Sequence, residues 1–133
     1  MARFAPGTVT LRNLSITGSH SGNGAGGAFY GEANLVLENS LLYDNTAGAA
    51  IAIVANNVTI TNSTITRTKL DSPTTFDYPV VMSDTVVVTN STIAHNEWGG
   101  IGSTTTVGRV VLRNSILAML RRGRDAWDEL TFA

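Results

Sequence analysis

The side chains best suited to acid–base chemistry in this sequence are Asp44, Arg67 and His95, and they share one position in a recurring phrase. Each follows an Asn by five residues, in "NSLLYD", "NSTITR" and "NSTIAH". An Asp or a His can act as a general acid or base, and an Arg can hold the carboxylate of an acidic sugar. Because the three residues lie far apart along the chain, this chemistry requires a fold that stacks one phrase on the next.

The recurring phrase is an internal repeat that occurs five times. Successive copies are 23 to 28 residues apart, and self-similarity at such a period predicts a stacked architecture. The copies read "VTLRNLSI" (9–16), "LVLENSLL" (35–42), "VTITNSTI" (58–65), "VVVTNSTI" (86–93) and "VVLRNSIL" (110–117). Their central residues are Asn13, Asn39, Asn62, Asn90 and Asn114.

Each copy alternates apolar and polar residues around its Asn. Apolar side chains stand four and two residues before the Asn and three residues after it, which predicts two short strands with one buried face. Asn tolerates the left-handed backbone region better than other non-glycine residues, so we expect it at the bend between the strands. Stacked rungs lie about 4.8 Å apart, which would let the Asn side chains form a hydrogen-bonded ladder. The Ser that follows four of these Asn residues is expected to form a small, inward-facing column.

A further short apolar segment, led by small residues, precedes each later copy. It reads "GGAFYG" (26–31), "GAAIAIV" (48–54), "YPVVMS" (78–83) and "GGIGS" (99–103). No helical periodicity lies between the copies. The sequence therefore predicts an all-β coil of about five rungs, with three short strands in each rung.

The "NSTI" and "NSILA" strand ends and the "GGA" unit, within residues 8–118, resemble the right-handed parallel β-helix of the pectin-lyase-like superfamily. They are similar to bacterial β-helix repeat proteins and to polymorphic outer-membrane-protein-like adhesins. The resemblance implies a right-handed parallel β-helix and a secreted or cell-surface location. It implies no single activity, because the superfamily includes polysaccharide lyases, polygalacturonases, epimerases and adhesins, and a fold does not determine function.

The catalytic signatures of the resembled enzymes do not carry over to this chain. Polygalacturonase-like enzymes have Asn-Thr-Asp, an Asp-Asp pair, Gly-His-Gly and Arg-x-Lys. This sequence has "NTA" (45–47), no adjacent Asp pair and His20 in "SHS", so only "RTK" (67–69) matches. Calcium sites of the pectate-lyase type need several clustered acids, and only Glu38 and Asp44 fall near a shared rung face. We expect no metal and no cofactor, with calcium entering only if the chain is a lyase.

Two functions remain open for the repeat. The first is a non-catalytic surface or secreted module, adhesin-like, that binds polysaccharide or serves as a stalk. The second is a fragment of a polysaccharide lyase or glycoside hydrolase that acts on acidic glycans through Asp44, Arg67 and His95. The missing signatures favour the first function, under which these three residues form an exposed ion-pair ladder.

Aromatic rings near the same turn indicate where a glycan would bind. Flat rings cover the apolar faces of sugars, and Tyr43, Phe76, Tyr78 and Trp98 gather around the stretch "HNEW" (95–98). They could instead pack the loop 67–79 and their own turns onto the coil. The residues expected to contact a ligand are Tyr43, His95, Asn96, Glu97 and Trp98.

The composition excludes several classes of protein. Apolar residues make up 43% and charged residues 14% of the 133 positions, which argues for a packed core and against disorder. A net charge of −1 without a basic stripe argues against nucleic-acid binding. No apolar run approaches the ~20 residues of a membrane-spanning helix, and the opening "MARFAPGTVT" lacks the apolar stretch of a signal peptide.

The tail after the last copy departs from the repeat. We expect one domain over 1–133, with rungs over about 8–118 and a cap or tail over 119–133. From position 117 into that tail, four apolar residues and one Arg fall near helical spacing, which predicts a capping helix over the last rung. These residues are Leu117, Leu120, Arg124, Trp127 and Leu130. Open strand edges invite association, so we also expect end-to-end self-association or a place within a longer β-helix.

Overall fold

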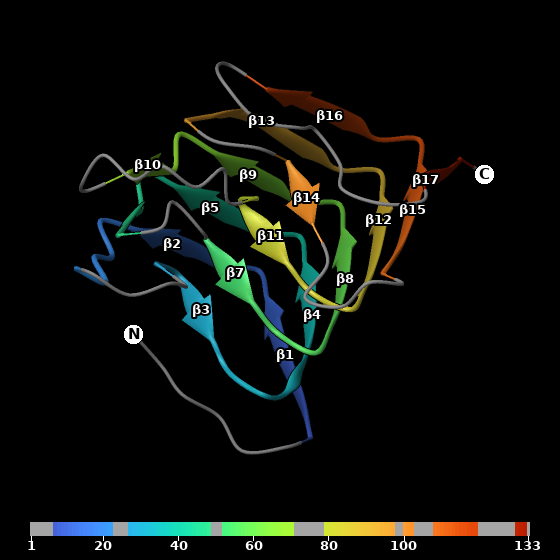
Figure 1. The fold of residues 1–133 in the computed structure, drawn as a ribbon, viewed down its shortest axis with the longest axis horizontal. Coiled ribbons are helices and arrows are strands. Elements are labelled where there is room, and N and C mark those ends of the chain that lie inside the picture. The colour runs from blue at the N-terminus through green and yellow to red at the C-terminus, as the bar shows by residue number, and fades with distance from the viewer. Residues whose placement is uncertain are drawn as a thin grey trace.

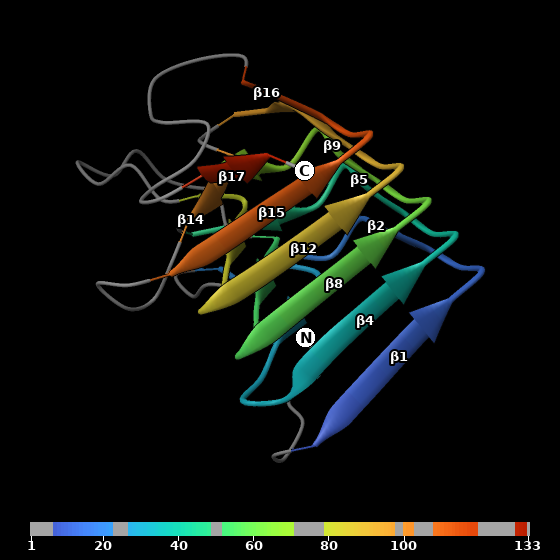
Figure 2. The same ribbon diagram turned by 90° about the vertical axis from the view of Figure 1, so that its right-hand side faces the viewer.

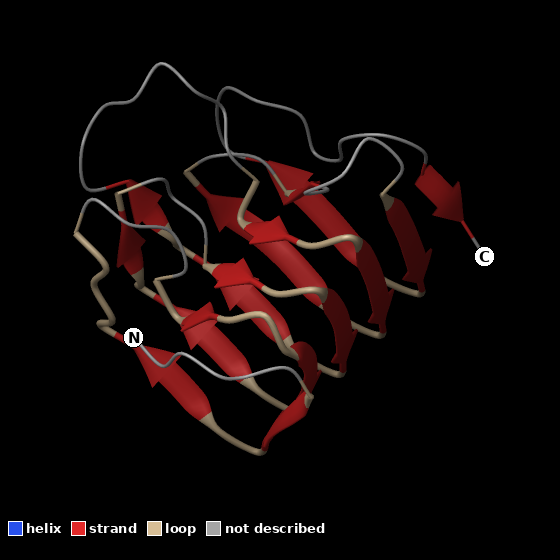
Figure 3. Ribbon diagram, turned by 60° about the horizontal axis from the view of Figure 1, so that its bottom comes forward, coloured by secondary structure: helices blue, strands red, loops and turns tan. Residues whose placement is uncertain are grey.

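Parallel strands wound into a coil make up the protein (Figure 1). The computed structural model describes residues 7–22, 27–48, 52–70, 79–97, 100–102, 108–119 and 130–132. Within these ranges every regular element is a β-strand (Figure 3), and every strand pairs with its neighbours in parallel.

Sheet 1 carries the longest strands and runs along one side of the coil in the order β1-β4-β8-β12-β15-β17. Figure 2 shows its first five strands side by side, each followed by a sharp bend. The strands are β1 (Thr8–Arg12), β4 (Asn34–Glu38), β8 (Asn57–Thr61), β12 (Thr85–Thr89), β15 (Arg109–Arg113) and β17 (Leu130–Phe132).

Two further sheets complete the coil. Sheet 2 follows the bend and comprises β2 (Ser15–Thr17), β5 (Leu41–Tyr43), β9 (Thr64–Thr66), β13 (Thr92–Asn96) and β16 (Ile116–Met119). Sheet 3 comprises β3 (Phe29–Tyr30), β7 (Ile53–Val54), β11 (Val81–Met82) and β14 (Ile101–Gly102). A short additional pair joins β6 (Thr46–Ala47) to β10 (Lys69–Leu70).

The register of sheet 1 places each residue beside its counterpart in the next repeat. Val9 pairs with Leu35 and Leu35 pairs with Val58. Val58 pairs in turn with Val86, and Val86 with Val110. Since side chains alternate between the two faces of a strand, this register keeps the apolar residues that stand four and two positions before each Asn on the inner face. The predicted parallel β-helix is confirmed, with five stacked copies and, from the second copy onward, three strands per rung in the described residues.

Aliphatic columns fill the inside of the coil. Leu37, Ile60 and Val88 are neighbours across three strands of sheet 1, and each is 0% exposed. Leu42 and Ile65 form a second column in sheet 2 and are buried to the same degree, at 1% and 0% exposure. Burying a side chain of this size stabilises the fold by about 1.5–3 kcal/mol, so these columns supply most of the driving force for coiling.

The five repeat Asn residues all adopt the left-handed backbone conformation, with φ between 45° and 56°. Each one ends a strand of sheet 1 and starts the bend into sheet 2. This conformation costs most L-residues free energy because Cβ approaches the carbonyl oxygen, and Asn is among the few that adopt it readily. The predicted role of Asn at the bend is confirmed.

The Ser that follows the Asn has a structural role that the sequence only partly indicated. Ser40, Ser63 and Ser91 are 4–6% exposed and face inward, as predicted. Each hydroxyl accepts a hydrogen bond from a backbone N–H one rung away, with Ser40 N to Ser63 Oγ at 3.1 Å and Ser63 N to Ser91 Oγ at 3.0 Å. Each also donates to the carbonyl two residues earlier. The hydroxyls thereby continue the inter-rung hydrogen bonding where the backbone turns, because buried N–H groups must be paired.

The end of the chain differs from the predicted capping helix. Residues 117–119 belong to strand β16, and 130–132 form β17, which pairs with β15 and extends sheet 1 by one strand. The residues between, 120–129, lie outside the described ranges. At both ends of the segment the chain forms strands that pair with distant strands, so these long-range hydrogen bonds determine the structure and the local helical spacing does not.

The part of the chain that the structure describes contains no helix long and apolar enough to cross a membrane.

Candidate functional site

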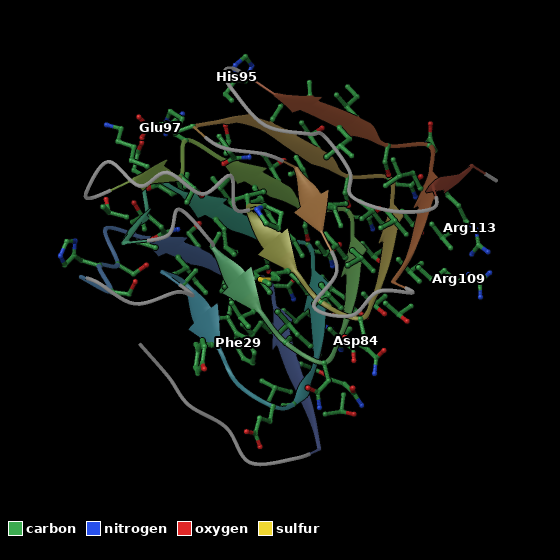
Figure 4. All side chains as sticks on the ribbon, in the orientation of Figure 1. Phe29, Asp84, His95, Glu97, Arg109 and Arg113 are labelled. Carbon is green, nitrogen blue, oxygen red and sulfur yellow. The ribbon has the colours of Figure 1, made fainter. Side chains whose placement is uncertain are left out.

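A second bend, at the far end of the sheet 2 strands, brings the predicted chemical residues together. Asp44, Arg67 and His95 occupy it on successive rungs with left-handed φ angles of 52°, 53° and 58°. The backbone N–H of Arg67 donates to the carbonyl of His95 at 3.2 Å, which places Arg67 between the other two. All three are exposed, and Figure 4 shows His95 projecting away from the coil. We call this surface the Arg67 corner. Met119 follows Asn114 by the same five residues, but it pairs with Asn96 rather than His95, across an irregularity in β13.

Arg67 donates two hydrogen bonds to the carboxylate of Asp44. Its Nε donates to Oδ1 at 2.8 Å and its Nη2 donates to Oδ2 at 2.9 Å. The guanidinium also lies over the ring of Tyr43, with Cζ 5.3 Å from the ring centroid, in a cation–π contact. Hydrogen bonding to Arg67 lowers the pKa of Asp44, and the same bond raises the pKa of Arg67.

This pairing decides what the Arg67 corner can do chemically. A general acid at neutral pH needs a carboxyl pKa raised toward 7, whereas that of Asp44 is lowered. Both Asp44 oxygens already accept from Arg67, so the carboxylate is fixed as a partner for a cation. Arg67 has five N–H donors and spends two on Asp44, so it retains donors for a second anion. The geometry suits binding of a carboxylate more than proton transfer.

A second Asn column, buried inside the coil, was not predicted. Asn45 and Asn96 directly follow the exposed corner residues and are 0% and 2% exposed. Nδ2 of Asn45 donates to the carbonyl of Ile16 at 3.1 Å, and Nδ2 of Asn96 donates to that of Ile65 at 3.1 Å. Their Oδ1 atoms accept from the backbone N–H of Ser19 and Thr68. These amides supply hydrogen bonds where the second bend interrupts the backbone pairing.

Asn96 is therefore not available for the ligand contact that the sequence predicted. Both ends of its side-chain amide are used inside the coil, and a buried amide with satisfied bonds gains nothing by turning outward. One sequence signal could have distinguished Asn96 from its exposed neighbours. Asn96 and Asn45 both stand six residues after a repeat Asn, which indicates a second structural position for Asn in the repeat.

Thr68 occupies the rung between the two buried Asn residues and is a weak point of that column. It is 1% exposed, and its Oγ1 has no hydrogen-bond partner. Replacing Thr68 by Val, which has nearly the same shape, should raise the free energy of unfolding by about 1 kcal/mol, because an unpaired buried hydroxyl is costly. Chemical denaturation measures this change. Thr66→Val on the outward face of β9 is the control, with a change within about 0.5 kcal/mol. A loss of stability in Thr68→Val would contradict this assignment.

The other predicted contact residues lie at different depths. Tyr43 is half-buried beneath Arg67. Glu97 is half-buried, its backbone N–H donates to the carbonyl of Thr68 at 2.9 Å, and it stands near His95 at one edge of the molecule (Figure 4). Trp98, Phe76 and Tyr78 lie outside the described residues. Among the residues described, no group of three or more His, Cys, Asp or Glu side chains is placed to hold a metal ion.

Amide hydrogen bonds run up the first bend, which we call the Asn corner. Nδ2 of Asn39 donates to Oδ1 of Asn13 at 3.2 Å, and Nδ2 of Asn62 donates to Oδ1 of Asn39 at 3.2 Å. Asn114 donates in the same way to Asn90 at 2.8 Å. Within the described ranges no amide bond joins Asn90 to Asn62, although the backbone N–H of Asn62 still donates to the carbonyl of Thr89 at 3.1 Å. The predicted ladder is present, with one interrupted step.

Two shallow grooves lie along the Asn corner, one on each side of the interrupted step, and the sequence did not point to them. The first is lined by Asn13, Leu14, Ser15, Asn39, Ser40, Leu41 and Asn62. The second is lined by Asn90, Ser91, Thr92, Leu112, Asn114, Ser115 and Ile116. Both combine side-chain amides with aliphatic side chains.

The outward face of sheet 3 carries no acid or base. Its outward positions hold Tyr30, which is 37% exposed, and the half-buried Val54 and Met82. On the last strand of this sheet Gly102 leaves room for Pro79, because a Cβ on Gly102 would lie 2.6 Å from Cγ of Pro79. Among the described residues, the Arg67 corner is therefore the place where the predicted acid–base side chains meet.

Comparison with known proteins agrees with this architecture. A family model described as "Right handed beta helix region" matches residues 4–120, which is most of the chain. Searches of curated proteins and of solved structures found no significant match. The repeat, the parallel stacking of its strands and the extent of this match together show that the chain belongs to the right-handed β-helix family.

Proposed function

We propose that this chain is a non-catalytic β-helix module that binds carbohydrate and that its Arg67 corner contacts the carboxylate of an acidic sugar. The observation that carries the proposal is the two-point hydrogen bonding of Arg67 to Asp44. It favours the ionised form of Asp44, which does not suit a general acid, and it orients a guanidinium beside an aromatic ring on an exposed surface.

The surroundings of Arg67 support binding of an anionic sugar. Lys69 stands close enough to help lower the pKa of Asp44, so two cations face one carboxylate at this point of the surface. Guanidinium groups pair with carboxylates through parallel N–H donors. A rigid bend also orders Arg67 before a ligand arrives, which reduces the entropy lost on binding.

Calorimetric titration with polygalacturonate oligosaccharides tests this proposal. The protein should bind them, and Arg67→Gln should weaken binding about tenfold, because a charge-assisted hydrogen bond contributes more than 1 kcal/mol. Arg12→Gln is the matched control, since Arg12 is also exposed and paired, with Nε 2.6 Å from Glu38, but lies at the Asn corner. Its affinity should equal that of the unmodified protein.

The catalytic alternative predicts a different result in the same samples. A lyase would release unsaturated uronates, which are detected by their ultraviolet absorbance, and would lose that activity in His95→Ala. Such a release would overturn the non-catalytic assignment. Absence of binding to every acidic and neutral glycan tested would overturn carbohydrate binding itself.

A further inference from the structure

We propose that the Asn corner is a second binding surface and that it takes an uncharged, unbranched polysaccharide chain lying along the axis of the coil. The inference rests on the proposed carbohydrate binding and assigns it a surface distinct from the Arg67 corner. The two corners lie at opposite ends of the sheet 2 strands, so each can be altered without touching the other.

The amides of the ladder offer regularly spaced hydrogen-bonding groups to a ligand. Each Asn amide has two N–H donors and an oxygen with two lone pairs, and the ladder uses at most one donor and one lone pair at each rung. One donor and one acceptor per rung therefore remain outward, on side chains that are exposed. A sugar hydroxyl both donates and accepts, so a chain of sugars matches this array. Rungs repeat about every 4.8 Å, close to the length of one sugar residue in an extended chain.

The interrupted step suits a bridging hydroxyl. Asn62 Oδ1 and Asn90 Nδ2 belong to adjacent rungs whose backbones are in register, with Thr61 beside Thr89. Since no amide bond closes this step in the described residues, one acceptor and one donor on exposed side chains are left for a ligand on neighbouring rungs. A single hydroxyl group that donates to the first and accepts from the second would complete the ladder. The step lies between the two grooves, where a bound chain would pass.

Aliphatic side chains beside the amides provide the apolar part of the surface. Ile116 is 60% exposed, the largest exposure of any large apolar side chain in the described residues, and it lines the second groove. Leu41 occupies the equivalent position in the first groove and is half-buried. A pyranose ring presents C–H groups on its faces and hydroxyls around its edge. Amides next to aliphatic groups would match both, because specific sites combine apolar contact with a few fixed polar groups.

The charge of the groove indicates which glycans it would accept. Neither groove lining contains a charged side chain. On the adjacent column Arg12 is neutralised by Glu38, which leaves Arg113, beside Asn114 at the end of the column, as its other charged side chain among the described residues. An acidic polysaccharide would thus meet one Arg here, against Arg67 and Lys69 together at the Arg67 corner, whereas an uncharged chain loses no hydration of charge on binding.

Titrations of the whole chain with a soluble linear β-glucan, a linear glucomannan and polygalacturonate test this assignment. Ile116→Thr reproduces the Thr found at the same position in β9 and β13, and Asn90→Gly keeps a residue that accepts positive φ while removing the amide. Each should weaken binding of a neutral polysaccharide about five- to tenfold, as expected for losing one buried contact or one hydrogen bond. Tyr30→Thr, an exposed apolar residue on sheet 3, is the matched control and should leave the affinity unchanged.

The outcomes separate this inference from the proposed function. If the neutral polysaccharides bind and the groove variants do not weaken them, the Asn corner is not the site, although carbohydrate binding stands. If only polygalacturonate binds, and binding depends on Arg67, the Asn corner is again excluded while the proposed function is supported. If none of the three binds, both fail. Thermal melting confirms folding of each variant, and Ile116→Thr alone keeps the test valid if Asn90→Gly does not fold.

Discussion

Ile60→Ala should lower the free energy of unfolding by about 3–4 kcal/mol, the largest effect expected from any single truncation discussed for this chain. Ile60 is 0% exposed on the inner face of β8, with Leu37 on one side and Val88 on the other. Truncation removes apolar contacts and leaves a cavity that neighbouring rungs cannot close, because backbone hydrogen bonds to β4 and β12 hold the spacing.

Thr59→Ala is the matched control for this prediction. Thr59 is the adjacent residue in the same strand, and it is exposed on the outer face of sheet 1. Its truncation should change stability by less than about 0.5 kcal/mol in the same urea titration. Equal effects at positions 59 and 60 would show that β8 is not buried on one face, and the proposed coil would then be wrong.

Asn62→Val should lower the free energy of unfolding by about 2–3 kcal/mol, whereas Asn62→Gly should change it by less than about 1 kcal/mol. Asn62 has φ of 48° at the middle of the Asn corner. A β-branched residue is strained in that conformation, and glycine is not. Valine also loses the amide bond to Asn39.

The contrast between the two variants of Asn62 separates backbone strain from the loss of the amide. Both remove the ladder bond, so a difference between them reports the left-handed conformation alone. Urea titration or thermal melting gives the values. If glycine destabilises the fold as much as valine does, the amide rather than the backbone conformation explains why the repeat carries Asn at this position.

The sequence was most informative where residue type and backbone conformation agree. Asn39 and Asn62 stand where left-handed φ is required, and Asn is the usual non-glycine solution, so the first bend could be located from the repeat alone. The alternation of apolar and polar residues around them predicted which face of each strand is buried. Together with the repeat spacing, it also predicted the register between neighbouring strands. Stacking of the copies then predicted that Asp44 lies beside Arg67, although nothing in the sequence near either residue indicates this contact.

The features that the sequence did not reveal depend on contacts between distant segments. Arg67 has the same left-handed backbone as the Asn residues, although Arg does not favour it, because stacked rungs impose the conformation of the bend. Asn96 looked like part of an exposed polar patch, and only the coil shows that its amide points inward. Strand β17 was not predicted, because the local residue spacing resembles that of a helix and contains no sign of the pairing with β15.

Under the two binding proposals the corners would recognise different glycans, and the sequence pointed only to the Arg67 corner. The Arg67 corner carries charge and an aromatic ring, while the Asn corner carries uncharged amides and aliphatic groups. A module of this kind would recognise glycans by their charge on one edge and by their hydroxyl pattern on the other. Comparing Arg67→Gln with Ile116→Thr against the same set of polysaccharides separates these roles.

The stacking of the Asn-centred segments is tested most directly by NMR couplings transmitted through backbone hydrogen bonds, which link a donor nitrogen to the carbonyl carbon that it contacts. The N–H groups of Asn39, Asn62 and Asn90 should show such couplings to the carbonyls of Thr61, Thr89 and Arg113 respectively. Couplings from the same N–H groups to carbonyls only a few residues away, as in hairpins, would contradict the coil and with it both proposed binding surfaces.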